Sequence, residues 1–179
     1  MVLISGRVVL LLALGVVVVG GVMLALNWLP GGAPAPAAPQ PASQQDSRDS
    51  WRLSDLSGET TGPADYQGKV VLVNFWATRC GYCVEEMPDM EKAARARAGQ
   101  VAILAVNFGE SQKAVESFLS GKGYSFRVLL DAEGKVAARY GIRALPTTLV
   151  FDRAGNLVRK VEGAIREAAF LKLIDEAAK

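Results

Sequence analysis

Two cysteines, Cys80 and Cys83, are the residues of this chain whose type and spacing point most directly to a reaction. Only Gly81 and Tyr82 separate them, and the sequence contains no other cysteine. A thiol at the first turn of a helix is stabilised as a thiolate by free backbone N–H groups and by the helix dipole. A C-x-x-C pair at a step from strand to helix therefore predicts thiol–disulfide exchange.

Two alternative roles for the cysteine pair remain open. A purely structural disulfide would close a very short loop, and such a loop adds little stability. A zinc site would need carboxylates to complete its shell, because two thiolates are too few and the chain contains no histidine. Val84, not histidine, follows the second cysteine, which excludes the haem-attachment motif. We expect no metal and no cofactor beyond a redox-active Cys80–Cys83 disulfide.

The elements around the pair predict a crossover from strand to helix to parallel strand. The apolar run from Val70 to Phe75 is typical of a buried strand, and a helix is expected from about Gly81 to Ala98. A second buried strand is expected over residues 101–106. This order places Cys80 at the start of the helix that joins two parallel strands.

The rest of the chain continues as one α/β domain. Ser111 is a suitable N-cap for a helix that reaches about Lys122, before the stop signal of Gly123. The remaining predicted elements are a small hairpin over residues 51–61, a strand over 126–130, a short helix over 134–140, strands over 147–151 and 157–161 joined by a turn, and a final helix over 166–178.

The N-terminal part contains an apolar segment long enough to cross a membrane. Residues 8–26 carry no charged side chain, and as a helix they would extend about 28 Å, close to the thickness of a bilayer core. Arg7 precedes this segment, so the positive-inside rule places the amino terminus in the cytoplasm. A cleaved signal peptide is the alternative, because residues 33–35 resemble a weak cleavage site.

The expected organisation has three parts. Residues 1–29 form a cytoplasmic tip and an uncleaved signal-anchor, residues 30–50 form a flexible linker rich in proline and alanine, and residues 51–179 form the folded domain. The chain of 179 residues has a net charge of only +2, which does not suit a nucleic-acid-binding protein.

Several motifs in one order resemble the thioredoxin fold, and in particular the membrane-anchored TlpA/ResA-like family. They are the strand-to-helix segment 74–83, the Glu85-Glu86-Met87-Pro88 segment, the strand segment 105–107 and the Ala144–Thr148 segment. The resemblance implies a central mixed sheet flanked by helices, with an N-terminal hairpin extension. It also implies a bacterial membrane protein whose domain lies on the periplasmic side and reduces disulfides there.

The resemblance also implies the roles of individual residues. Cys80 is expected to be the exposed nucleophile and Cys83 the buried thiol that resolves the mixed disulfide. Glu86 is expected beside the pair as a carboxyl that handles cysteine protons, although it could serve only the helix dipole. Leu145 and a cis Pro146 are expected to bind an extended client chain. Tyr82 is expected to stack on a partner or to be exposed without a role.

Two residues depart from cytosolic thioredoxin. Asn74 stands where thioredoxin carries a buried aspartate, so Glu86 is the remaining acidic candidate. Arg79 replaces the usual tryptophan before the first cysteine. A cation at this position could lower the pKa of Cys80, or it could be a solvated side chain without effect.

The expected function is reduction of specific protein disulfides, for instance those of apocytochrome c or of a copper site in an oxidase. The resemblance implies a transmembrane thiol carrier of the CcdA/DsbD kind as electron donor, because an oxidising compartment otherwise keeps the pair as a disulfide. A disulfide oxidase or isomerase on the same fold is one alternative. A non-catalytic protein that binds clients or delivers copper is another.

Overall fold

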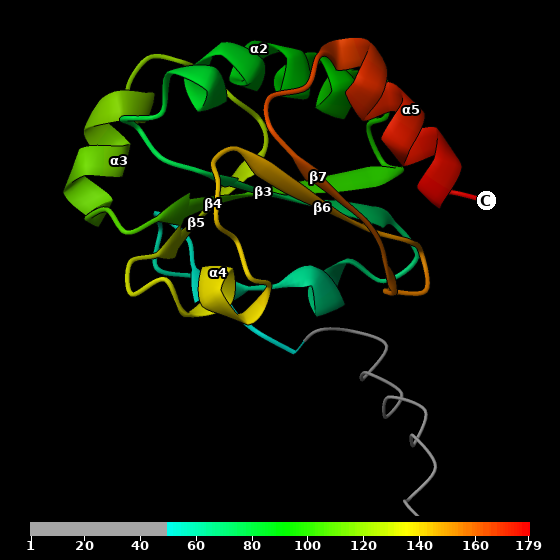
Figure 1. The fold of residues 1–179 in the computed structure, drawn as a ribbon, viewed down its shortest axis with the longest axis horizontal. Helices are drawn as coiled ribbons and strands as arrows, with labels where there is room; N and C mark the ends of the chain where they lie inside the picture. Colours follow the sequence, from blue (N-terminus) through cyan, green and yellow to red (C-terminus); the bar gives the residue numbers. More distant parts are fainter. Residues whose placement is uncertain (1–49) are drawn as a thin grey trace, which may run out of the picture. The chain divides into compact units, whose positions relative to one another are not determined.

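The computed structural model describes residues 50–179, and these form a five-stranded sheet in the order β5-β4-β3-β6-β7 (Figure 1). The three strands β3, β4 and β5 run parallel, and β6 and β7 complete the sheet in antiparallel pairs. The bounds are Val70–Trp76 for β3, Val101–Phe108 for β4, Arg127–Asp131 for β5, Thr147–Phe151 for β6 and Leu157–Glu162 for β7. The predicted mixed sheet is therefore confirmed.

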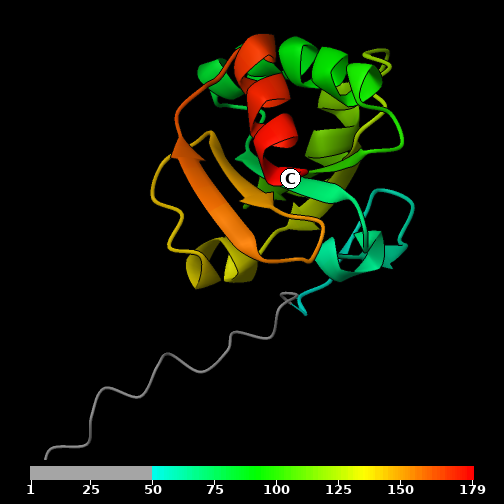
Figure 2. The ribbon, with the colours of Figure 1, turned by 90° about the vertical axis from the view of Figure 1, so that its right-hand side faces the viewer.

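Helices cover both faces of this sheet (Figures 1 and 2). One face carries α2 (Gly81–Ala96), α3 (Gln112–Leu119) and α5 (Glu167–Ala177), and the other carries α4 (Lys135–Arg139) and the 3-10 helix η1 (Pro63–Tyr66). The first helix to follow β3 is the one that begins directly after Cys80. The crossover predicted from the sequence is thus the one that positions the cysteine pair.

The central strand β3 is buried along its whole length because helices lie on both sides of it. Val70, Leu72 and Trp76 pack in the core on the α2 side, whereas Val71 and Phe75 pack in the core on the α4 side. Burial on both faces explains why this strand reads as a nearly continuous apolar run, interrupted by Asn74, and not as an alternating one.

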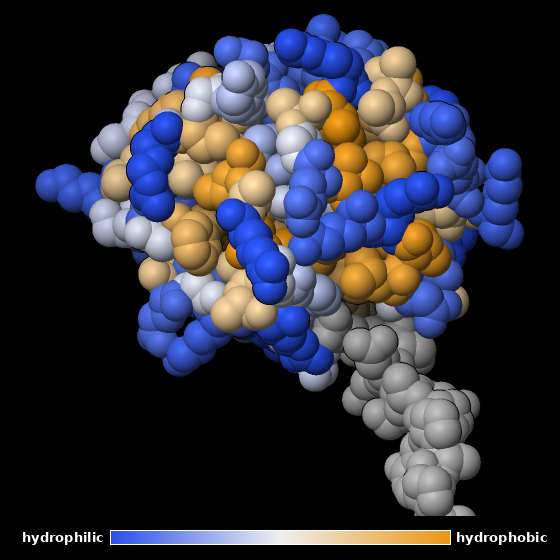
Figure 3. Space-filling model, viewed as in Figure 1, coloured by the Kyte–Doolittle hydropathy of each residue, from blue (hydrophilic) through white to orange (hydrophobic). Residues whose placement is uncertain are grey.

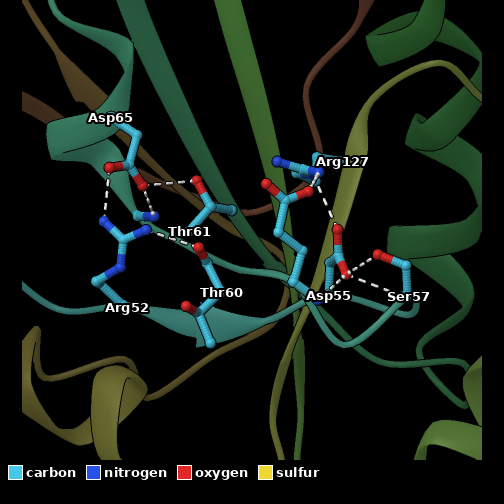
Figure 4. Close-up of polar contacts among 9 residues, drawn as sticks. Arg52, Asp55, Ser57, Thr60, Thr61, Asp65 and Arg127 are labelled. Atoms are coloured by element: carbon cyan, nitrogen blue, oxygen red, sulfur yellow. Dashed lines mark hydrogen bonds and ion pairs between the residues drawn. The ribbon is translucent and has the colours of Figure 1, made fainter.

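The N-terminal hairpin is a separate two-stranded sheet that lies against the β5 edge of the main sheet. Strands β1 (Leu53–Ser54) and β2 (Thr60–Thr61) pair with each other, and Asp55 forms an isolated bridge with Leu129 of β5. The Asp55 carboxylate accepts hydrogen bonds from Ser57 and pairs with Arg127 at 3.1 Å (Figure 4). The hairpin predicted from the sequence is confirmed, and an ion pair ties it to the sheet.

The helix predicted after Ser111 is confirmed at its start and wrong at its end. Ser111 caps α3 as predicted, but the helix ends at Leu119 and not near Lys122. The predicted membrane anchor and linker lie outside the described residues. Within residues 50–179, no helix is long and apolar enough to cross a bilayer.

Candidate active site

The cysteine pair lies at the amino end of α2, as predicted. Cys80 is the N-cap residue, and its sulfur accepts a hydrogen bond from the backbone N–H of Cys83 at 3.2 Å. The two cysteines are joined as a disulfide. Cys80 is partly exposed, whereas Cys83 is 1% exposed. This arrangement gives an incoming thiol access to the Cys80 sulfur, and after reduction the same N–H group stabilises a thiolate there.

The peptide bond between Leu145 and Pro146 is cis, as the resemblance implied. The register pairs Phe75 of β3 with Thr147 of β6, so Pro146 lies beside the end of β3 that leads to Cys80. Its carbonyl accepts a hydrogen bond from Gly163 N at 2.8 Å, and Leu145 is half-buried. Chain segments far apart in sequence therefore meet at the carboxyl end of the central strand.

Glu86 is 1% exposed and lies on the buried face of α2, one turn after Cys83. Its carboxylate accepts hydrogen bonds from Asn74 Nδ2 at 2.8 Å and from the backbone N–H of Ile165 at 3.0 Å. Burial raises the pKa of this carboxyl above its ordinary value, and the two hydrogen bonds and the charge of Arg166 only partly oppose that rise. Such a group can hold or release a proton near the resolving cysteine.

Asn74 belongs to β3, and its side chain contacts α2 at the position where thioredoxin carries an aspartate. Its amide nitrogen donates to Glu86 and also to the hydroxyl of Thr148 at 3.0 Å. The sequence pointed to Asn74 and Glu86 separately, and the structure shows that their side chains are in direct contact. Thr148 and Ile165 were missed as partners; Thr148 stands in the Ala144–Thr148 motif, but nothing in the local sequence marks Ile165.

Arg79 forms an ion pair with Glu110, with 3.2 Å between Nη1 and Oε1. Glu110 follows the end of β4 by two residues, and no motif in the local sequence marks it as part of the site. Tyr82 projects into solvent with 69% of its surface exposed. Among residues 50–179, no three cysteine, aspartate or glutamate side chains come close enough together to hold a metal ion.

A disulfide at the N-cap of a helix, beside a cis proline and on a sheet of this order, is the arrangement of thioredoxin-fold thiol–disulfide oxidoreductases. The sequence pattern of the Redoxin family matches residues 32–172. The chain belongs to this family, and within it to the TlpA/ResA-like proteins of thioredoxin fold.

Relatives of known sequence are named as thiol-disulfide oxidoreductases. The chain is 39% identical over 126 residues to the thiol-disulfide oxidoreductase ResA of Halalkalibacterium halodurans, a match that covers 68% of this chain and 72% of that protein. It is 38% identical to ResA of Bacillus subtilis, over 65% of each chain. The matched region thus spans about two thirds of the relatives' own length.

Solved structures agree on the fold. The exposed lipoprotein thioredoxin Etrx1 of Streptococcus pneumoniae is 30% identical, with a TM-score of 0.64 over 70% of this chain and 98% of that one. StoA of Bacillus subtilis has a TM-score of 0.61 over 69% of this chain and 94% of that one, and its identity of 21% makes it evidence for the fold alone. The protein is therefore a thiol–disulfide oxidoreductase with Cys80 and Cys83 as its cysteine pair.

Proposed function

We propose that this protein is a membrane-tethered, extracytoplasmic reductase of specific protein disulfides, such as those of apocytochrome c or of the copper-site cysteines of an oxidase. The observation that carries the proposal is the buried Glu86 carboxyl, one turn after the buried Cys83. A reductase must deprotonate its resolving thiol once per cycle, and a carboxyl with a raised pKa is a suitable acceptor.

The reaction proceeds in two exchange steps. The Cys80 thiolate attacks one sulfur of the client disulfide, and the other client sulfur leaves as a thiolate that takes a proton from water. Cys83 then loses its proton to Glu86, attacks the Cys80 sulfur and releases the second client thiolate. The client is reduced by two electrons, and the enzyme ends with the Cys80–Cys83 disulfide.

Client binding involves the surface around the cysteine pair. Tyr82 is exposed beside Cys80, and Leu145 and Pro146 lie where an extended chain could add along the backbone. Apolar side chains gather between long hydrophilic ones on the face that carries β7 and the loop before β6 (Figure 3). A mixed surface of this kind suits a folded or partly folded protein client.

Reducing equivalents would have to come through the membrane. A transmembrane thiol carrier of the CcdA/DsbD kind is the proposed donor, because an oxidising compartment would otherwise keep the pair as a disulfide. The proposed location is the cytoplasmic membrane of a bacterium, with residues 8–26 as the anchor and the folded domain on the periplasmic side.

The reduction potential of the Cys80–Cys83 couple tests the direction of exchange. A reductase is expected near −270 mV, as for thioredoxin, whereas a potential near −120 mV would identify an oxidase. A Cys83→Ala variant should accumulate a mixed disulfide on Cys80, and mass spectrometry of the adduct would identify the client. The Cys80→Ala Cys83→Ala double variant is the control, and an equal yield of adduct from it would contradict the mechanism.

A further inference from the structure

One carboxylate holds the turn that leads into Cys80. Glu110 Oε2 accepts a hydrogen bond from the backbone N–H of Thr78 at 2.8 Å, and Oε1 accepts one from the Thr78 hydroxyl at 2.7 Å. Asn107, near the end of β4, donates to Oε2 at 2.7 Å. Because Cys80 N donates to the carbonyl of Ala77, Thr78 lies inside the turn that presents the cysteine.

The same carboxylate compensates the charge beside Cys80. Arg79 lies 3.2 Å from Glu110 Oε1, and the Glu110 side chain is 10% exposed whereas that of Arg79 is 62% exposed. Partial burial by itself would raise the pKa of Glu110. The net effect is the opposite: its pKa lies below the ordinary value because of the hydrogen bonds from Asn107 and Thr78 and the charge of Arg79. Glu110 is therefore ionised at neutral pH and pairs with the cation next to the nucleophile.

We propose that Glu110 is the positioning residue of the cysteine turn: it fixes Thr78 to the end of β4 and neutralises Arg79 next to Cys80. The α2 amino terminus, and not an uncompensated arginine, then sets the fraction of Cys80 that is thiolate. This inference depends only on thiol chemistry at Cys80. It holds for either direction of exchange, so it can fail or succeed independently of the proposed reductase function.

Glu91 provides a matched control within the same fold. Its Oε2 accepts hydrogen bonds from the backbone N–H and the hydroxyl of Ser125 at 2.7 Å and 3.1 Å, and its Oε1 pairs with Arg95 at 2.6 Å. Glu91 thus fixes a loop and compensates an arginine in the same manner as Glu110. It lies roughly 16 Å along α2 from Cys80, given the rise per residue of a helix.

The test measures the pKa of Cys80 in the reduced protein, from the pH dependence of its alkylation rate. Glu110→Gln should lower this pKa by about half a unit, because Arg79 is left uncompensated. Arg79→Ala should raise it by about the same amount, because Glu110 is left unpaired. The double variant should return it close to the wild-type value, and Glu91→Gln should not change it.

A second measurement tests the positioning of the turn. Glu110→Ala removes the acceptor of the Thr78 amide, so hydrogen exchange of that amide should accelerate by tenfold or more, an effect on the order of one lost hydrogen bond. Glu91→Ala should leave the exchange of Thr78 unchanged.

The single variants Glu110→Gln and Arg79→Ala together decide whether the proposal stands. A Cys80 pKa that stays at its wild-type value in both Glu110→Gln and Arg79→Ala overturns the proposal, whatever the effect on stability, because Glu110 would then be a structural anchor like Glu91. If Glu110→Gln does not fold, Arg79→Ala decides alone, since Arg79 is mostly exposed.

Discussion

Asn74 Nδ2 donates a 2.8 Å hydrogen bond to Glu86 Oε1, and both side chains are 1% exposed. The contact joins the central strand β3 to the helix that carries the cysteines. The hydrogen bonds favour the ionised carboxylate, whereas burial favours the neutral acid and is the larger effect. An uncharged amide at position 74 therefore allows one buried carboxyl here, where two would repel each other.

Glu86→Gln should change the titration of the cysteines. Loss of the carboxylate removes a negative charge that opposes thiolate formation, so the pKa of Cys83 should fall by about one unit. Alkylation kinetics or NMR of the reduced protein measures this pKa. Glu85→Gln is the matched control, because Glu85 is the exposed neighbour on the same turn. Unchanged pKa values of both cysteines in Glu86→Gln would exclude a proton-handling role.

Glu86 should also make stability depend on pH. Folding raises its pKa, so the folded chain binds this proton more tightly than the unfolded chain. Its contribution to the free energy of unfolding is therefore fully present below the ordinary pKa of 4.5 and is lost as pH rises through the raised value. The loss is about 1.4 kcal/mol for each unit by which folding raises the pKa.

Guanidinium unfolding at several pH values checks this dependence. The difference in unfolding free energy between wild type and Glu86→Gln should decrease as pH rises from 4 to 8. Glu85→Gln controls for the loss of an exposed carboxylate on the same turn of α2. A difference for Glu86→Gln that increases with pH would mean that folding lowers the pKa of Glu86.

Cys80 and Cys83 should differ strongly in reactivity. In the reduced protein, iodoacetamide should label Cys80 faster than Cys83 by on the order of a hundredfold, because Cys83 is 1% exposed and Cys80 caps the helix. Peptide mapping after a short reaction measures the ratio. In denaturant the two rates should become similar, and faster labelling of Cys83 in the folded protein would reverse the assigned roles.

Asp55→Asn should destabilise the N-terminal hairpin. Asp55 is 7% exposed, and its carboxylate accepts hydrogen bonds from Ser57 and Glu59 while pairing with Arg127 (Figure 4). The expected loss is about 1–2 kcal/mol of unfolding free energy. Glu59→Gln is the control, because Glu59 also contacts Arg127 but is mostly exposed and should have a much smaller effect. Equal losses in the two variants would contradict this assignment.

Gly62→Ala should be among the most damaging small substitutions in the described part of the chain. A Cβ at position 62 would lie 2.0 Å from the carbonyl oxygen of Trp51, so the backbone would have to move. The expected loss is about 2 kcal/mol or more in unfolding free energy. Gly81→Ala, whose Cβ meets open space at the start of α2, should leave stability equal or slightly higher.

The sequence predicted β3 and β4 well because parallel strands that are buried on both faces produce nearly continuous apolar runs. The end of α3 was predicted less well. The glycine stop signal suggested an end near Gly123, but Gly121 already adopts a positive φ of 75° and the helix ends at Leu119. Two closely spaced glycines gave the same signal, and only the packing of the following segment decides which one ends the helix.

The site was predictable where a motif fixes its residues and unpredictable where the partners come from distant segments. Cys83 and Glu86 lie on α2 and Cys80 caps it, so helical spacing placed them relative to one another. Glu110 contacts a residue 32 positions away and Ile165 contacts one 79 positions away. Such contacts depend on the strand order and on the path of each loop, which local patterns do not specify.

The place where the chain enters its folded part has a practical consequence. Trp51 is buried in the core on the α4 side, and its indole N–H donates to the Tyr140 hydroxyl at 2.9 Å. The disulfide lies at the start of α2, which covers the opposite face of the sheet (Figure 2). A bead, a fluorophore or a fusion partner attached just ahead of Trp51 would therefore join the folded part on the face of the sheet opposite to α2. Immobilisation at that point keeps the attachment away from α2, the helix that Cys80 caps, while clients are captured on Cys80.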